Sequence, residues 1–302
     1  MAIFSLVNLD QTVLSALKHF TVQKPKTLKL NSFHRPLVVG SGNAYNTGLV
    51  IFSKQPAIIT NESNFKDVLI GYKKLIKRGD INQVVVISAS GEKDSIWEIK
   101  LAKKYGLSTH LITCSPDSSA AKLTDKITVY DRLPEPYTYN VSTYLGMMIG
   151  ASGERADKII NFLKKLKLPR LQDYSAYSFI LPDRFANIAP MLEIKRHELF
   201  GPHLSLRAFS EGEARHAKFV NVWDKELVIS FGPNRYFGSP LSRQEITIPR
   251  WADNGFIMAL SYYLIGHIQK IKPPYFQRNI ERYCLEGPLA YGQKKPFKLI
   301  VE

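Results

Sequence analysis

Short uncharged runs rich in β-branched residues alternate along the first half of the chain with amphipathic stretches. The runs lie at 36–40, 57–60, 84–88, 109–113 and 127–130. A run with no alternation of apolar and polar positions is typical of a strand covered on both faces. The stretches between the runs, among them 64–78 and 93–105, have apolar residues at helical spacing. This pattern predicts parallel strands joined by helices, which is the α/β class.

A second round of the same pattern follows. Strands are expected at 177–181, 204–208 and 226–231, and a helix at 188–199. The mostly apolar segment 256–268 is typical of a buried helix, and 298–301 of a short terminal strand or extended tail. We therefore expect two doubly wound parallel-sheet halves of similar plan. The expected divisions are an N-terminal helix and connector over 1–35, a first domain over 36–168 and a second domain over 169–302.

Three turns of the first half carry small and hydroxyl side chains at the carboxyl ends of strands. They are Gly40-Ser41-Gly42, the turn from Ser88 to Ser95, and the loop from Thr113 to Ser119. Ligands of open α/β sheets bind at that edge, where the strand order reverses. The Ser88–Ser95 turn also opens a helix, so unpaired backbone N–H groups and the helix dipole favour an anion there. Serine and aspartate are equally common as caps and turn formers, so a purely structural use of each single loop stays open.

Charge and cysteine content narrow the function classes. The 302 residues carry a formal net charge of +15, but the basic residues are scattered, with no basic arm, zinc-finger spacing or aromatic RNA-binding signature. We therefore expect solvated helix faces and small anionic ligands rather than nucleic acid. The two cysteines, Cys114 and Cys284, form no disulfide framework or metal-ligand pattern. The longest nearly uncharged stretch, 256–268, is too short for a bilayer and the first residues lack a basic signal-peptide start, so no membrane association and a cytoplasmic location are expected.

The order of motifs resembles the sugar isomerase (SIS) domain. The resemblance rests on a hydrophobic strand, Ser88-x-Ser90-Gly91, a helix, a Leu-Ile-Thr strand and a Ser-rich loop, with Gly40-Ser41-Gly42 similar to the family's first glycine turn. The segment 193–198 is similar to Leu-Lys-x-x-Glu, and 211–216 to Glu-x-x-His-Gly, in the isomerase domain of glucosamine-6-phosphate synthase. Both also resemble segments of the phosphoglucose/phosphomannose isomerases. Two departures are Lys93, where a threonine is usual, and Ala217, where glycine often follows the histidine.

The resemblance implies isomerisation of a phosphorylated hexose or amino sugar through an enediol, without metal or organic cofactor. It implies that Glu198 moves the proton between C1 and C2, and that His216 assists ring opening. For such a role Glu198 needs burial that raises its pKa, whereas histidine already titrates near neutrality. The alternatives are a solvated helix-face carboxylate for Glu198 and a surface histidine for His216. The expected substrate-binding residues are Gly42, Ser88, Ser90, Gly91, Lys93, Ser95 and Glu135.

Other functions and roles stay open at this point. An amino-sugar phosphate deaminase or deglycase needs the same enolisation, and a non-catalytic sugar-phosphate sensor needs the same phosphate loop. Glu135, between two prolines, is either a sugar contact or part of a stiff surface loop. Glu213 could orient His216 or be an exposed helix charge. A homodimer is expected because members of the family commonly complete their sites across subunits.

Overall fold

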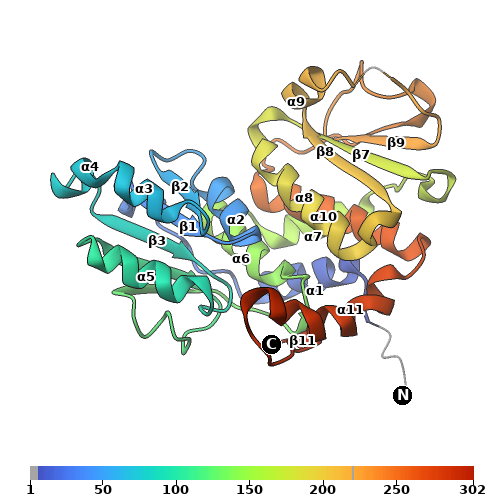
Figure 1. The fold of residues 1–302 in the computed structure, drawn as a ribbon. Helices are drawn as coiled ribbons and strands as arrows, with labels where there is room; N and C mark the ends of the chain where they lie inside the picture. The colour runs from blue at the N-terminus through green and yellow to red at the C-terminus, as the bar shows by residue number, and fades with distance from the viewer. Residues whose placement is uncertain (1–5, 220) are drawn as a thin grey trace. The chain divides into compact units, whose positions relative to one another are not determined.

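Each predicted round of strands forms its own parallel sheet in the computed structural model, which describes residues 6–219 and 221–302 (Figure 1). One compact unit comprises residues 23–133 and 142–153 and contains the five-stranded sheet A. The other comprises residues up to 22, 134–141 and 154–302 and contains the four-stranded sheet C. The fold class predicted from the sequence is confirmed.

Sheet A has the strand order β2-β1-β3-β4-β5, with every neighbouring pair parallel. Its order reverses at β1, which lies between β2 and β3, so the carboxyl ends of β1 and β3 form the switch point where open α/β sheets bind ligands. The strands are β1 (Leu37–Gly40), β2 (Ile58–Asn61), β3 (Gln83–Ile87), β4 (Ser108–Thr113) and β5 (Lys126–Val129). The helices of this unit are α2 (Asn43–Ile51), α3 (Phe65–Gly71), α4 (Lys73–Lys77), α5 (Asp94–Lys104) and α6 (Val141–Ser152), which begins at the unit boundary.

One apolar core joins sheet A to helices α3 and α5. Phe65 and Leu69 of α3 and Ile99 of α5 pack with inward residues of β1 and β3, and all are fully buried. The helix predicted over 64–78 is two helices, because the chain leaves helical geometry at Tyr72 (φ −91°, ψ 7°), directly after Gly71. Glycine weakens a helix interior, so this is where the break is least costly.

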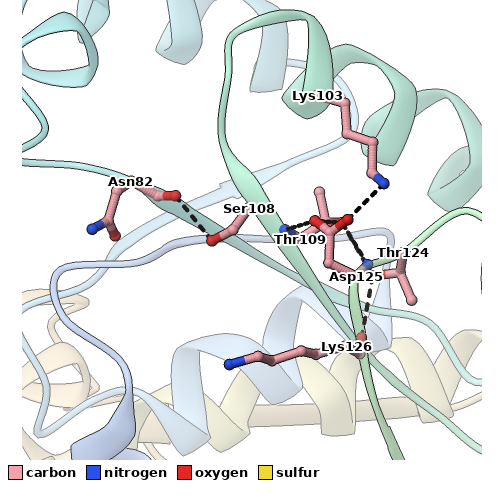
Figure 2. A network of polar contacts seen from close by, with 7 residues as sticks. All are labelled: Asn82, Lys103, Ser108, Thr109, Thr124, Asp125 and Lys126. Carbon is pink, nitrogen blue, oxygen red and sulfur yellow. Dashed lines mark hydrogen bonds and ion pairs between the residues drawn. The ribbon is translucent and has the colours of Figure 1, made fainter.

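A polar network ties the amino-terminal ends of β4 and β5 together, at the edge of sheet A opposite the serine-rich turns (Figure 2). The carboxylate of Asp125 accepts hydrogen bonds from the backbone N–H and hydroxyl of Thr109, both at 2.8 Å, and from Lys103 Nζ at 2.7 Å. These donors lower the pKa of Asp125 to about 2. The network therefore holds α5 and two strand ends without using any group of the ligand edge.

Sheet C repeats the winding with the order β10-β9-β7-β8, again all parallel. Its strands are β7 (Ala176–Leu181), β8 (Ser205–Ser210), β9 (Glu226–Ser230) and β10 (Arg243–Glu245). The helices of this unit are α1 (Leu9–Val22), α7 (Ala156–Lys165), α8 (Ala189–Phe200), α9 (Glu211–His216), α10 (Asn254–Ile271) and α11 (Tyr275–Glu286). The predicted buried helix 256–268 is the centre of α10, whose side chains are nearly all buried.

The compact units divide the chain differently from the predicted segments 1–35, 36–168 and 169–302. Helix α1 packs against α7 and α10, so it belongs with sheet C. A β-carbon on Gly266 of α10 would lie 2.0 Å from the backbone nitrogen of Asp10, which shows how closely α1 and α10 approach. The predicted terminal strand is β11 (Ile300–Val301), which pairs antiparallel with β6 (Glu135–Pro136). None of the described helices has the length and apolar character needed to span a bilayer.

Candidate functional site

The three serine-rich turns of sheet A meet at the carboxyl ends of β1, β3 and β4. The hydroxyl of Ser41 donates to the carboxylate of Asp94 at 3.0 Å, which joins the first glycine turn to the start of α5. The N–H of Ala120 donates to the carbonyl of Gly91 at 3.0 Å, and the N–H of Cys114 to the carbonyl of Ala89 at 3.0 Å. The structure therefore brings together the loops that the sequence placed at one edge.

The close approach of the Ser88–Ser95 turn to the loop at Ser118 requires glycine at position 91. Its φ is +62°, in the region that favours glycine, and an added β-carbon would lie 2.0 Å from Ser118 Oγ. Both the backbone conformation and the close approach to the neighbouring loop exclude a larger residue.

Some hydroxyl groups of the turn form hydrogen bonds within it, while several of its backbone N–H groups stay unpaired among the described residues. Ser88 Oγ accepts from the N–H of Gly91 at 3.1 Å, and Ser95 Oγ, in a buried side chain, donates to the carbonyl of Glu92 at 2.8 Å. The backbone N–H groups of Ser90, Asp94 and Ser95 have no acceptor among the residues that the structure describes. Unpaired first-turn N–H groups and the dipole of the eleven-residue α5 are suited to a phosphate or carboxylate.

Lys93 occupies the position before α5 with a left-handed backbone, φ +57°. A non-glycine residue in this conformation costs about 1–3 kcal/mol and persists only where its surroundings impose it. Burial lowers the pKa of the Lys93 ammonium, and the charge of Asp94 acts in the opposite direction. The side chain is about half-buried, so its charge counts more than in open solvent.

Carboxyl groups line the first turns of α5. Asp94 accepts from Ser41 and, at 3.2 Å, from the indole N–H of Trp97. One turn later Glu98 is 1% exposed, and its Oε1 has no hydrogen-bond partner in the described part of the chain. Burial, then the charges of Asp94 and Glu62, raise the pKa of Glu98 to about 8, so it is largely protonated at neutral pH.

Gly42 starts helix α2 at the same edge. Its φ is +54°, and nothing lies within 4 Å of the place that a side chain would take. The backbone is therefore approachable at this point, as a ligand contact would need.

The predicted base Glu198 forms a buried ion pair in the unit of sheet C. Lys195 Nζ, whose side chain is completely buried, lies 2.5 Å from Glu198 Oε2, whereas 23% of the Glu198 side chain is exposed. Burial raises the pKa of Glu198, and the charge and hydrogen bond of Lys195 oppose that rise. The direction is the one that a general base acting near neutral pH needs.

Two further contacts fix Lys195. Its ammonium donates to the carbonyl of Thr138 and lies 5.6 Å from the ring centroid of Tyr262 on α10. Thr138 has φ +76°, which for a β-branched residue is a strained conformation. The hydrogen bond between the Lys195 ammonium and the Thr138 carbonyl therefore stabilises both the strained backbone of Thr138 and the position of Lys195 beside Glu198.

The charge of the same carboxylate influences three tyrosines of this unit. Burial raises the pKa values of Tyr137, Tyr139 and Tyr283, and the charge of Glu198 contributes to each rise. These phenols stay protonated at neutral pH and can donate hydrogen bonds. Tyr283, from α11, was not anticipated, because no pattern in the sequence links that helix to residue 198.

His216 ends α9 and is exposed, and no hydrogen bond or ion pair joins it to Glu198 in the part of the chain that the structure describes. Glu213 does not orient it. Instead Glu213 and Ser210 form a capping box, in which Ser210 Oγ accepts from the N–H of Glu213 and the Glu213 carboxylate from the N–H of Ser210. The role predicted for His216 stays a prediction.

Glu135 is 2% exposed, and its Oε2 accepts from the N–H of Val141 at 2.7 Å. It therefore stabilises the first turn of α6, and its predicted sugar contact stays a prediction. The described residues contain no group of three or more histidine, cysteine or acidic side chains that could hold a metal ion.

Lys195 is the residue whose importance the sequence reasoning missed. Its spacing of three from Glu198 places both side chains on one face of helix α8. The spacing between residues 195 and 198 predicts that the two side chains are neighbours. It does not predict that the Lys195 ammonium is buried.

Comparison with known proteins identifies the fold. Glucosamine-6-phosphate deaminase from Thermotoga maritima superimposes with a TM-score of 0.58 at 16% identity, covering 87% of this chain and 92% of that one. The C-terminal domain of glucosamine-fructose-6-phosphate aminotransferase from Francisella tularensis gives 0.57 at 15% identity, covering 87% and 94%. Tagatose-6-phosphate ketose/aldose isomerase from Escherichia coli gives 0.57 at 14% identity, covering 88% and 89%.

Sequence comparison adds little to this. No family model matches the chain. Betaine aldehyde dehydrogenases of Brucella ovis and Brucella canis are 31% identical over 91 residues, which is 26% of this chain. The chain spans only 18% of the length of these curated relatives, so the likeness is local.

The chain has the fold of the SIS proteins, with two doubly wound halves, as the resemblance in its motifs implied. At these identities the likeness concerns the fold alone. What this chain does with the fold depends on its own residues.

Proposed function

We propose that the protein is an aldose–ketose isomerase acting on a phosphorylated hexose or amino sugar. The single observation that carries the proposal is the meeting of three turns around the unpaired N–H groups of Ser90, Asp94 and Ser95 at the start of α5. Such a site is suited to a phosphate monoester. Lys93 adds charge to it, and Gly42 and the hydroxyls of Ser88, Ser90 and Ser95 complete the proposed binding set.

Glu198 is the proposed base that moves a proton between C1 and C2 of the open-chain sugar. Burial raises the pKa of its carboxyl, which is the direction that accepting and returning a proton near neutral pH requires. Lys195 holds this carboxylate in position, and its ammonium can stabilise negative charge that develops on the neighbouring sugar oxygen. His216 is the proposed group for ring opening, and Glu135 is kept as a proposed sugar contact. These steps need side chains alone.

Hydrogen exchange at C1 or C2 of the sugar tests the enolisation directly. The protein is incubated in deuterium oxide with glucose 6-phosphate, fructose 6-phosphate, tagatose 6-phosphate and glucosamine 6-phosphate. The C2 proton of the two aldoses and the C1 protons of the two ketoses are followed by NMR. We expect exchange and isomerisation of at least one of these sugars, and both lost in Glu198→Gln. Glu281→Gln, at an exposed position of α11, is the control and retains both. Absence of exchange with every sugar contradicts the isomerase.

Hydrolytic deamination is the second candidate, because the same enolisation would serve it and a glucosamine-6-phosphate deaminase shares the fold. Release of ammonia from glucosamine 6-phosphate separates the two reactions. If the wild-type protein binds these sugars without exchange or ammonia release, the site is that of a sugar-phosphate sensor.

The proposal extends to a homodimer in the cytoplasm. Sedimentation equilibrium of the purified chain tests the dimer, for which a mass of about twice the 34.3 kDa chain is expected. A single species of one chain's mass contradicts it.

A further inference from the structure

The edge of sheet C at β10 is open. Strand β10 pairs with β9, and the N–H of Ile246 continues that pairing by donating to the carbonyl of Ser230 at 2.8 Å. Alternate backbone groups of a strand point to opposite sides, so the N–H groups of Glu245 and Thr247 point away from β9. No acceptor for the N–H of Thr247 occurs among the described residues.

A groove of about 300 Å³ runs beside this edge. One wall is the strand end, and the other is the end of α7 with the residues that follow it. The lining residues are Phe162, Lys165, Leu166, Lys167, Gln244, Glu245, Ile246 and Thr247. The groove thus combines an apolar floor with an unpaired strand edge.

The rim of the groove is positively charged. Lys165 and Lys167 line it, with Lys164 beside them, and all three are exposed and form no ion pair within 6–219 and 221–302. The one carboxylate in the lining, Glu245, already accepts from the N–H of Asn234 at 2.9 Å. Lys165 and Lys167 outnumber this carboxylate in the lining, so a ligand at the rim meets a net positive charge.

We propose that this groove binds an extended acidic segment of a partner protein, which adds to sheet C along the free side of β10. Backbone hydrogen bonds to Glu245 and Thr247 would give the segment its direction, as in other cases of strand addition. Apolar side chains at alternate positions would contact Phe162, Leu166 and Ile246, and acidic side chains between them would pair with Lys165 and Lys167. A small free anion would use the lysines but leave the apolar floor and the strand edge unused.

The test uses the full chain and a fluorescein-labelled seven-residue peptide in which glutamate alternates with valine. Fluorescence anisotropy should show saturable binding that weakens with added salt, and the same peptide with lysine in place of glutamate should not bind. The double variant Lys165→Glu/Lys167→Glu should bind the acidic peptide at least about tenfold more weakly. Thr247→Pro, which removes the outward N–H, should weaken it similarly.

Lys73→Glu/Lys74→Glu is the matched control, because these exposed lysines of α4 lie in the other unit and change the net charge equally. It should bind the peptide like the wild type. Equal weakening by both charge pairs, or no binding of the acidic peptide to the wild type, overturns the proposal. Displacement of the peptide by a single-stranded RNA that binds more tightly also overturns it, in favour of a nucleic-acid groove. The two lysine pairs change only surface charge, so the test stands even if Thr247→Pro does not fold.

Discussion

The turns that follow β3 and β9 lie at corresponding places in two sheets of the same winding, yet they differ in how their hydrogen-bonding groups are paired. In sheet A, β3 leads through Ser88–Ser95 into α5, and first-turn N–H groups remain unpaired. In sheet C, β9 leads through residues 231–239 into a short 3₁₀ turn and then β10, with no α-helix between the two strands. Among the described residues, the turn after β3 leaves backbone donors unpaired, whereas the turn after β9 forms hydrogen bonds within itself.

The turn after β9 is filled by its own side chains. The amide of Asn234 accepts from the N–H of Phe237 at 2.9 Å and donates to the carbonyl of the same residue at 2.9 Å. The guanidinium of Arg243 donates to the carbonyls of Phe237 and Gly238. The side chains of Asn234 and Arg243 are thus hydrogen-bonded to backbone groups of their own turn, so the winding order alone does not leave groups for a ligand.

The two turns also differ in the residues that adopt a positive φ. The turn after β9 places only glycines there, Gly232 and Gly238, whereas the turn after β3 places Lys93 there in addition to Gly91. Glycine adopts a positive φ at little cost, as it does in the turn after β9, whereas lysine is strained there. A lysine at position 93 is therefore consistent with selection of this side chain for its charge. The comparison leads to four predictions.

The largest expected effect comes from one added methyl group in each turn. Gly91→Ala places a β-carbon 2.0 Å from Ser118 Oγ, and Gly238→Ala places one 2.4 Å from Val228 Cγ2, each at a positive φ. Both variants should lose at least about 1–3 kcal/mol of unfolding free energy. Only Gly91→Ala should also lose phosphate affinity, by at least about tenfold. Urea unfolding and isothermal titration with inorganic phosphate measure the two effects, and equal affinity losses would remove the distinction between the turns.

Glu98→Gln should stabilise the protein at high pH. A carboxyl whose folded-state pKa is near 8 and whose unfolded value is near 4.5 contributes stability that is complete below about pH 4.5 and lost as the pH rises through 8. The neutral amide avoids that loss, so the gain should widen by on the order of 2 kcal/mol between pH 6 and pH 9. Urea unfolding at both pH values measures it. A gain independent of pH, or one shared by the exposed Glu281→Gln, would show that Glu98 is not the group responsible.

Asn234→Ala should weaken the turn after β9 without changing the anion site. The substitution removes the partners of two partly buried backbone groups at Phe237, which costs about 1–3 kcal/mol. Phosphate affinity, measured by titration calorimetry at a temperature where the variant is folded, should equal that of the wild type. A parallel fall in affinity would mean that the turn after β9 also contacts phosphate.

The smallest effect is expected at the opposite edge of sheet A, where Figure 2 shows Asp125 among its donors. Because the pKa of Asp125 is lowered to about 2, its contribution is present above the usual value near 3.8 and lost as the pH falls to 2. The side chain is 45% exposed, so solvent screening limits the loss in Asp125→Asn at pH 7 to about 1 kcal/mol. Acid titration of the far-ultraviolet circular dichroism at fixed urea concentration should show the difference disappearing near pH 2. A difference that persists there would assign the effect to packing.

The sequence was sufficient for the strands that are buried on both faces, because their side chains are apolar without alternation. Val84–Ile87 and Tyr177–Leu181 are uniformly apolar or nearly so, and both are strands. Strand β10 was missed because Arg243, Gln244 and Glu245 are polar, as suits an edge strand that is buried on neither face. Helix α11 was missed because it is short and mostly polar, with only Phe276, Ile280 and Cys284 buried.

The parts of the candidate site that lie within one turn of the chain could be predicted from the sequence. The parts that depend on residues far apart in the sequence could not. Glycine and serine spacing indicated the loop at Ser88–Ser95, and the structure places its neighbouring loops against it. The burial of Lys195 and the strained Thr138 carbonyl that holds it could not be read from spacing, because residues 138 and 195 meet only in the folded chain. The structural use of Glu135 was hidden for the same reason, since its acceptor role depends on the helix that starts at Val141.

The most direct test is an amide NMR titration of the deuterated, nitrogen-15-labelled protein with inorganic phosphate at constant pH and ionic strength. We expect saturable shifts of the backbone amides of Ser90, Asp94 and Ser95 at the turn after β3, and unchanged amides at Tyr236 and Phe237 in the turn after β9. Shifts of equal size in both turns, or no shift at Ser90, Asp94 and Ser95, would contradict the assignment of the anion site to sheet A.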